Sequence, residues 1–281
     1  MNEDHATFYT ESGVKRMTLC LAATCRYKSE PAMVLCCDMT GTRDEVISES
    51  SDKLRRIKDS DVLLAGNLNA AKELLIVCEQ KIEKYDKGGD ELAVTELLKS
   101  LREAVWAYRS NINHQYLTRV YGIRFGDFQK TGKALFYEAD HARIWNELKS
   151  LDMGAGLIIS SFSDDEVMHL SISSDGHVAW VDHYAVQGTG ARICNTFLAQ
   201  RVYDDYMSLE ECLYRVLEAK MAAERDPYVG EQTVVAVVTP NERSWVDDDY
   251  ITEIFQKIDK RKKIPPIHFD ERFLKLDGPE S

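Results

Sequence analysis

Three side chains with complementary chemistry stand at the edges of predicted strands in the N-terminal part of the sequence: Thr18, Asp38 and Lys53. Thr18 opens the run TLCLAATC, Asp38 ends the run AMVLCCD, and Lys53 opens the segment KLRRI. The first two runs have strand length and flank the turn-like RYKSEP, so a hairpin should place Asp38 beside the start of the strand that Thr18 opens. An ion pair of Lys53 with Asp38 would favour deprotonation of a neighbouring hydroxyl. The pattern predicts a hydroxyl nucleophile supported by a buried ion pair.

Each of these residues also has a structural interpretation. Threonine is frequent in strands, aspartate in turns and lysine on surfaces. The GTG sequence at 188–190 is equally ambiguous, because glycine-rich turns often connect a strand to a helix. It is the joint order and spacing of these features that favours a functional site.

The composition is that of a globular protein. Hydrophobic residues make up 44% of the 281 positions, which is enough for a sizeable core. The formal net charge of −12 opposes sequence-independent binding to phosphate backbones. No apolar run is long enough to span a membrane, and the polar N-terminus MNEDHATFYTESG lacks the features of a signal peptide. We therefore expect a cytoplasmic protein that binds neither nucleic acid nor membranes.

The seven cysteines lie mostly within apolar stretches. Their odd number and their spacing argue against a complete disulfide framework and against a zinc knuckle. We interpret them as reduced thiols of the core, with a disulfide framework, metal ligands or a cysteine nucleophile as the alternatives.

The predicted elements follow the order strands, two helices, strands, two helices, strand. The first strands are expected at 18–25, 32–38, 53–57 and 61–66, with a polar loop at 41–52. The helix pairs are expected at 69–85 with 91–116 and at 191–206 with 208–226, Ser208 being the N-cap of the last helix. The remaining strands are expected at 119–127, 133–140, 156–163, 167–173, 177–190 and 232–240.

Every sheet and every amphipathic helix must bury an apolar face. The element order therefore favours an α+β fold, a four-layer αββα sandwich of two stacked antiparallel sheets with a helix pair on each outer face. Residues 241–281 follow as a C-terminal extension with a short helix at 251–260. The extension is either a docking element between subunits or a solvated surface segment.

The order of these features resembles the N-terminal nucleophile hydrolases of the proteasome β-subunit type, including the bacterial HslV-type peptidase subunit. Six segments carry the resemblance, in the family's order: TLCLAA, VLCCD, SSDKLRRI, LLAGNLNAAKELL, QGTGARICN and ERDPYVGEQTVVAVV. Together they cover residues 18–240, which would form the hydrolase domain. Residues 1–17 would be a leader, a propeptide or an over-extended start.

The resemblance implies roles for the first three residues. Thr18 would be the nucleophile and its freed α-amine the general base, while Asp38 and Lys53 would be the ion pair that tunes it. An acyl-enzyme ester on Thr18 would form and then be hydrolysed by water, without a metal or an organic cofactor. Thr18 must then be the first residue of the working protein, exposed either by cleavage after Met17 or by a start at Met17 followed by methionine removal.

The resemblance also assigns supporting residues. The backbone N–H of Asn69 would occupy the oxyanion position, and Thr189 and Asp226 would support the amine network. Several positions depart from the family pattern, among them Met39-Thr40, which replaces the usual SR after the aspartate. Asn69 stands where glycine is usual, Val229 where a hydroxyl is usual, and Met17 where cleavage usually follows a glycine.

The implied function is cleavage of peptide or amide bonds in a self-compartmentalised homo-oligomeric ring that encloses a peptide or protein substrate, with or without an ATPase partner. One alternative is a catalytically silent scaffold or binding subunit, and another is a small-molecule amidase of the same fold. Joint retention of Asp38 and Lys53 favours the active alternatives, because a scaffold does not need a buried charge pair.

Overall fold

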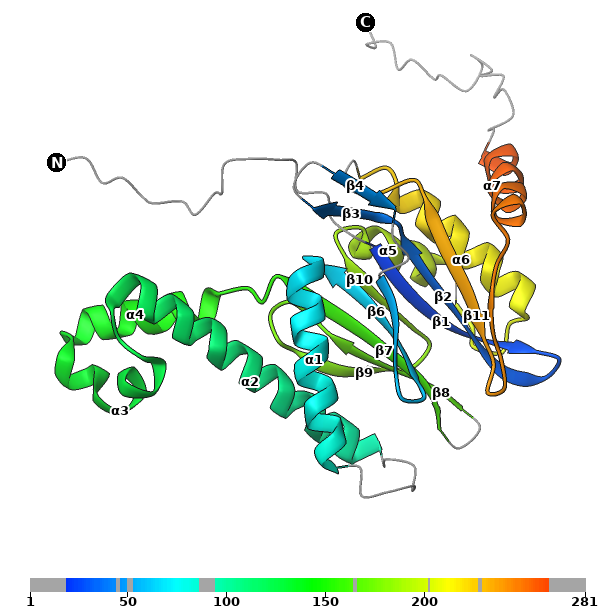
Figure 1. Cartoon of the computed structure of the whole chain (residues 1–281). Helices are drawn as coiled ribbons and strands as arrows, with labels where there is room; N and C mark the ends of the chain where they lie inside the picture. Colours follow the sequence, from blue (N-terminus) through cyan, green and yellow to red (C-terminus); the bar gives the residue numbers. More distant parts are fainter. Residues whose placement is uncertain are drawn as a thin grey trace, which may run out of the picture.

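The computed structural model describes residues 19–43, 46–49, 53–85, 94–163, 166–201, 203–226 and 229–262. Within these ranges the chain has an α+β fold with two antiparallel five-stranded sheets and seven helices (Figure 1). The fold class and the antiparallel sheets agree with the sequence-based prediction. Residues 1–18, which include Thr18, lie outside the described residues.

The predicted opening hairpin forms the middle of the first sheet, whose strand order is β10-β1-β2-β11-β12. The strands are β1 (Leu19–Tyr27), β2 (Glu30–Asp38), β10 (Tyr184–Gly188), β11 (Thr233–Val238) and β12 (Arg243–Trp245). Apart from their ends at the turn, β1 and β2 are buried along their whole length. Side chains cover both faces of these strands, which explains why the two sequence runs are apolar throughout and do not alternate.

The second sheet has the strand order β5-β6-β7-β8-β9. Its strands are β5 (Leu54–Ile57), β6 (Ser60–Gly66), β7 (Ala155–Ser163), β8 (Glu166–Ile172) and β9 (Val178–Val181). A separate hairpin of β3 (Thr40–Arg43) and β4 (Val46–Glu49) precedes it. The sequence predicted a polar loop at 41–52, and this prediction is wrong for the paired residues, because a polar segment carries no alternation that would reveal backbone pairing.

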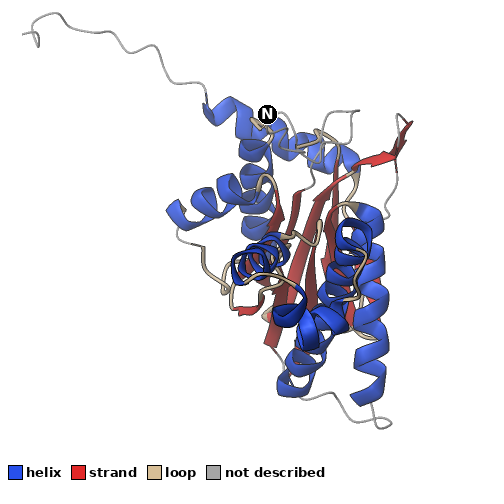
Figure 2. Ribbon diagram, turned by 90° about the vertical axis from the view of Figure 1, so that its left-hand side faces the viewer, coloured by secondary structure: helices blue, strands red, loops and turns tan. Residues whose placement is uncertain are grey.

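Helices lie on both sides of the stacked strands (Figure 2). Four of them cover the outer faces of the sheets: α1 (Leu68–Tyr85), α2 (Val94–Tyr121), α5 (Ala191–Gln200) and α6 (Leu209–Ala223). The first core lies between the first sheet and α5 and α6, the second between the second sheet and α1 and α2, and a third between the two sheets. Ser208 caps α6 as predicted, because its side chain accepts a hydrogen bond from the Glu211 N–H.

A helical arm departs from the prediction. Strands were expected at 119–127 and 133–140, but α2 continues to Tyr121 and is followed by α3 (Phe125–Leu135) and α4 (Glu138–Ser150). Both strand predictions are wrong, because the aromatic residues of these segments pack into a small helical core of their own. We call α3, α4 and the end of α2 the helical arm; it projects beyond the sheets (Figure 1).

The described part of the C-terminal extension is joined to the first sheet. Strand β12 pairs with β11, and α7 (Asp248–Lys262) follows it. Three isoleucines of α7, Ile251, Ile254 and Ile258, are buried in the same core as α6. This burial contradicts the solvated alternative for residues up to 262, and the helix predicted at 251–260 lies within α7.

A buried chain of hydrogen bonds links the two sheets. The His169 imidazole in β8 lies between two hydroxyls: Thr24 Oγ1 in β1 is 3.1 Å from Nε2, and Ser160 Oγ in β7 is 2.8 Å from Nδ1. All three side chains are buried. Burial lowers the pKa of His169 to about 3, so the imidazole is neutral in the folded protein.

The neutral His169 should make folding sensitive to acid. An unfolded histidine has a pKa near 6.5, so between that pH and the folded pKa of about 3 the unfolded state binds a proton that the folded state excludes. Lowering the pH from 7 to 5 should therefore reduce the free energy of unfolding by about 2 kcal/mol through this group alone. Urea denaturation at both pH values measures the difference. His169→Gln should remove this part of the dependence, whereas His183→Gln, at an exposed position, should retain it; equal pH dependence in all three proteins would contradict the prediction.

Candidate functional site

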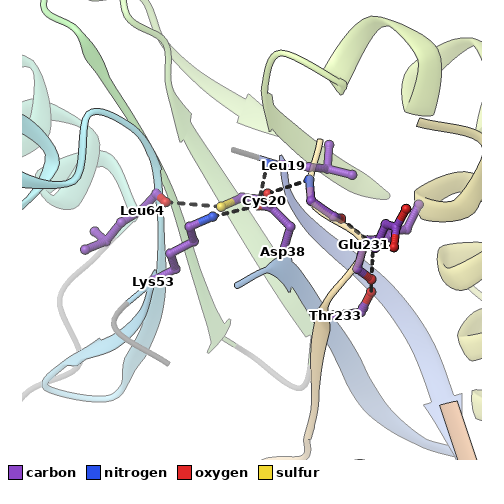
Figure 3. A network of polar contacts seen from close by, with 9 residues as sticks. Leu19, Cys20, Asp38, Lys53, Leu64, Glu231 and Thr233 are labelled. Carbon is purple, nitrogen blue, oxygen red and sulfur yellow. Dashed lines mark hydrogen bonds and ion pairs between the residues drawn. The ribbon is translucent and has the colours of Figure 1, made fainter. Parts of the chain in front are cut away.

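The ion pair expected from the sequence is present and enclosed. Lys53 Nζ lies 2.7 Å from Asp38 Oδ1, and the two side chains are 2% and 0% exposed. Asp38 ends β2 in the first sheet, whereas Lys53 directly precedes β5 in the second, so the pair bridges the two sheets (Figure 3). Its length and its burial make it a charge-assisted hydrogen bond with little screening by water.

Both carboxylate oxygens of Asp38 accept further hydrogen bonds from the main chain. The Leu19 N–H donates to Oδ1 over 2.8 Å, and the Gly230 N–H donates to Oδ2 over 3.1 Å. The Leu19 nitrogen belongs to the peptide bond with residue 18, so the carboxylate anchors the start of β1, as the hairpin predicted. Sequence reasoning missed both donors, because main-chain groups are common to all residue types.

Two thiols lie beside the ion pair. Cys20 and Cys37 are cross-strand partners in β1 and β2, and Cys20 Sγ donates to the Leu64 carbonyl oxygen over 3.2 Å (Figure 3). Burial raises the pKa of Cys20 well above its usual range and that of Cys37 to about 12, although the charge of Lys53 opposes both shifts. Both thiols stay protonated at neutral pH, which does not suit a nucleophile. All seven cysteines are buried and free, in agreement with the expected core thiols.

The GTG sequence lies beside the start of β1. Gly188 pairs with Leu19 in the register of the first sheet, and Thr189 directly follows it. The Thr189 hydroxyl is buried and has no hydrogen-bond partner among the described residues. Gly190 permits close packing at this place, because a Cβ there would lie 2.8 Å from Cγ2 of the buried Val229. The GTG turn therefore places the Thr189 hydroxyl, which has no partner among the described residues, one residue beyond the cross-strand partner of Leu19.

The backbone N–H of Asn69 is already engaged in a helix cap. Helix α1 begins at Leu68, and Asn67 Oδ1 accepts from the N–H groups of Asn69 (3.0 Å) and Ala70 (3.1 Å). The Asn67 N–H in turn donates to the Gly154 carbonyl oxygen over 2.7 Å. An oxyanion donor must be directed at the developing charge. This geometry opposes the oxyanion role that the sequence suggested for Asn69, and the reason is a cap formed by its own neighbour.

Of the remaining two predicted residues, the structure describes Asp226 alone. Asp226 lies in the turn after α6, where its side chain is half-buried and its carbonyl oxygen accepts from the Val229 N–H over 3.0 Å. Thr18, the predicted nucleophile, lies outside the described residues. The structure thus places the groups around the start of β1 and does not describe the hydroxyl itself.

Other features of the described residues concern the outer surface, metal binding and membrane spanning. A surface hollow of about 510 Å³ lies between α5 and α6 on the outer helix layer, and its lining includes Arg192, Phe197 and Arg225. No group of three or more His, Cys, Asp or Glu side chains in the described ranges is arranged to hold a metal ion. No helix in these ranges has the length and apolar character needed to cross a membrane.

The sequence matches no protein-family model, and no curated protein is significantly similar to it. The sequence motifs and the geometry around Asp38 therefore carry the information about function. That geometry combines a fixed carboxylate, a fixed ammonium and the hydroxyl of Thr189, which has no hydrogen-bond partner within the described ranges and follows the strand partner of Leu19. Such a set can orient the peptide group before Leu19 and favour a deprotonated oxygen next to it.

Proposed function

We propose that the chain is a threonine-type N-terminal nucleophile hydrolase of the proteasome β-subunit type, which cleaves peptide or other amide bonds. The observation that carries the proposal is the enclosed Asp38–Lys53 pair that also accepts the Leu19 N–H. Apolar residues of similar volume would stabilise a core at least as well as a buried ion pair. Its position next to residue 18 therefore favours a chemical role over a structural one.

The proposed reaction begins when Thr18 is the first residue of the chain. Its Oγ attacks the carbonyl carbon of the scissile amide, and its freed α-amine, with an unperturbed pKa of about 8, accepts the hydroxyl proton. The positive charge of Lys53 favours the deprotonated oxygen, and Asp38 holds both Lys53 and the start of β1 in place. Thr189, one residue beyond the partner of Leu19, would hydrogen-bond to the amine.

The carbon–nitrogen bond then breaks, and the leaving amine takes the proton from the α-amine of Thr18. The acyl group remains as an ester on Oγ until water hydrolyses it and restores the hydroxyl. Because the Asn69 N–H is engaged in the helix cap, the oxyanion needs another donor. By resemblance to the family we extend the proposal to a homo-oligomeric ring, which native mass spectrometry would test.

The test of this function is the loss of the Thr18 hydroxyl. A protein that begins at Thr18 should be labelled by a β-lactone probe, and so should Thr18→Ser, whereas Thr18→Ala should not be labelled. Hydrolysis of a fluorogenic peptide amide should fall at least about 10³-fold in Thr18→Ala, because the nucleophile is lost. Intact-mass spectrometry with N-terminal sequencing establishes which residue comes first. Labelling that persists in Thr18→Ala, or full activity in a protein that retains Met1, would contradict the proposal.

A further inference from the structure

A second buried lysine, Lys220, lies in the helix layer and binds the segment that donates a hydrogen bond to Asp38. Lys220 lies near the end of α6, and its side chain is 0% exposed. Its Nζ donates to the carbonyl oxygens of Gly230 (2.7 Å) and Glu231 (2.9 Å), and it forms an ion pair with Glu224. These three contacts match the three N–H bonds of an ammonium group, so the charge is fully hydrogen-bonded.

The two carbonyl oxygens belong to the segment that binds Asp38. We call residues 229–231 the Gly230 segment. The Gly230 N–H donates to Asp38 Oδ2 over 3.1 Å, and the Glu231 carbonyl oxygen also accepts from the Thr233 hydroxyl over 3.2 Å (Figure 3). Thr233 is the cross-strand partner of Asp38. Lys220 therefore binds the carbonyl oxygens of the Gly230 segment, and the same segment binds Asp38 through the Gly230 N–H.

Packing alone does not account for a lysine at this position. On α6 the neighbouring buried residues Val216, Ala219 and Ala223 are apolar, and a methionine would fill the space of Lys220 without the cost of burying a charge. The Phe255 ring of α7 lies 5.9 Å from Nζ and helps to exclude water from it. What the ammonium adds is a cross-link between α6 and the Gly230 segment.

We propose that Lys220 is a positioning residue for the site. It fixes the Gly230 segment so that the Gly230 N–H orients the Asp38 carboxylate, and Asp38 in turn holds Lys53 and the Leu19 N–H. Without this support the Gly230 N–H is no longer held against Oδ2 of Asp38, so the carboxylate can rotate more easily and move Oδ1 away from Lys53. The catalytic consequence rests on the proposed hydrolase function, whereas the link from Lys220 to Gly230 does not.

Amide hydrogen exchange of the full chain tests the link. In Lys220→Met, exchange of the Gly230 N–H should accelerate at least about tenfold more than exchange of Ala22 in β1, which reports global stability. Val216→Ala is the matched control, since it weakens the same helix without removing a hydrogen bond, and it should affect both amides alike. Lys220→Arg, which retains donors, should restore part of the Gly230 protection. Equal acceleration of both amides in Lys220→Met overturns the inference.

Kinetics of the active protein test the catalytic consequence. For a fluorogenic peptide amide, kcat should fall about tenfold in Lys220→Met with KM changed less than about twofold, and Val216→Ala should retain kcat. An unchanged kcat in Lys220→Met overturns the positioning role. If the parent protein does not hydrolyse amides, the hydrolase proposal fails, and the exchange result still decides the link.

A third variant covers the case in which Lys220→Met does not fold. Glu224→Gln weakens the ion pair of Lys220 but leaves the ammonium in place. It should accelerate Gly230 exchange about threefold relative to Ala22, because the lysine is then held less firmly. No difference between the two amides in Glu224→Gln would then overturn the inference.

Discussion

Lys53→Met should lower the free energy of unfolding by about 3–5 kcal/mol at pH 7, because it removes the ammonium group that lies 2.7 Å from the buried Asp38 carboxylate. The N–H groups of Leu19 and Gly230 would still bind the carboxylate but would not neutralise it. Adding Asp38→Leu to this variant should recover only part of the loss, since those two N–H groups then lose their acceptor. Urea denaturation of the single and double variants measures both effects.

A lysine in an exposed ion pair is the control for this experiment. Lys257 and Glu253 of α7 lie 2.7 Å apart, but both side chains are more than half exposed. Solvent screens such a pair, so Lys257→Met should leave the denaturation midpoint unchanged. A loss of less than about 1 kcal/mol in Lys53→Met would mean that its ion pair behaves like a surface pair, and would contradict an enclosed site.

Gly66→Ala should destabilise the protein by about 2–4 kcal/mol, the sum of a backbone penalty and a steric one. Gly66 ends β6 with φ of +85°, in the left-handed region, and a Cβ there would lie 2.5 Å from the Gly154 carbonyl oxygen. That oxygen also accepts the Asn67 N–H, so it cannot move without loosening the turn that begins α1. Thermal denaturation measures the effect.

Gly126→Ala is the matched control for Gly66→Ala. Gly126 lies in α3 without a positive φ, and a Cβ there would meet nothing within 4 Å. Alanine in a helix should stabilise the protein by up to about 1 kcal/mol. If both variants were equally stable, the close approach of Gly66 to Gly154 would not constrain the fold.

The central strands and the ion pair were predictable from the sequence. The signal for the strands is a continuous run of apolar residues. Strands that are buried on both faces read as unbroken apolar runs, as in β1 and β2, and a polar residue that ends such a run stands out. Asp38 stood out in this way, whereas Lys53 was identified by its place at the start of the next predicted strand. The hairpin placed Asp38 beside the start of β1, and the structure adds Lys53 at 2.7 Å.

The helical arm was not predictable from periodicity. Tyr121, Ile123 and Phe125 alternate with polar residues or glycine, and this period of two is typical of a strand. In the structure they span the connection between α2 and α3, and all three pack against the arm's own core, which includes Phe128. Apolar and polar residues that alternate across the junction of two helices therefore cannot be distinguished from a strand until the residues that pack against them are known.

The supporting groups of the site were hidden for another reason. Leu19 and Gly230 contribute main-chain N–H groups, and the engagement of Asn69 depends on the side chain of Asn67. Lys220 did leave a signal, because it stands four residues after Val216 on the apolar face of α6. The sequence shows a charge at a core position there but does not show which carbonyl oxygens it binds.

Helix α2 runs without a break from one core into another. Leu101 and Tyr108 pack beneath the second sheet, whereas Leu117 packs in the arm with Phe128. At 1.5 Å per residue the part of the helix from Tyr108 to Tyr121 spans about 20 Å, so its end in the arm moves about 2 Å for a tilt of about 5°. Such a tilt would change the outline that the protein presents to a neighbour, while the ion pair between the sheets would keep its geometry.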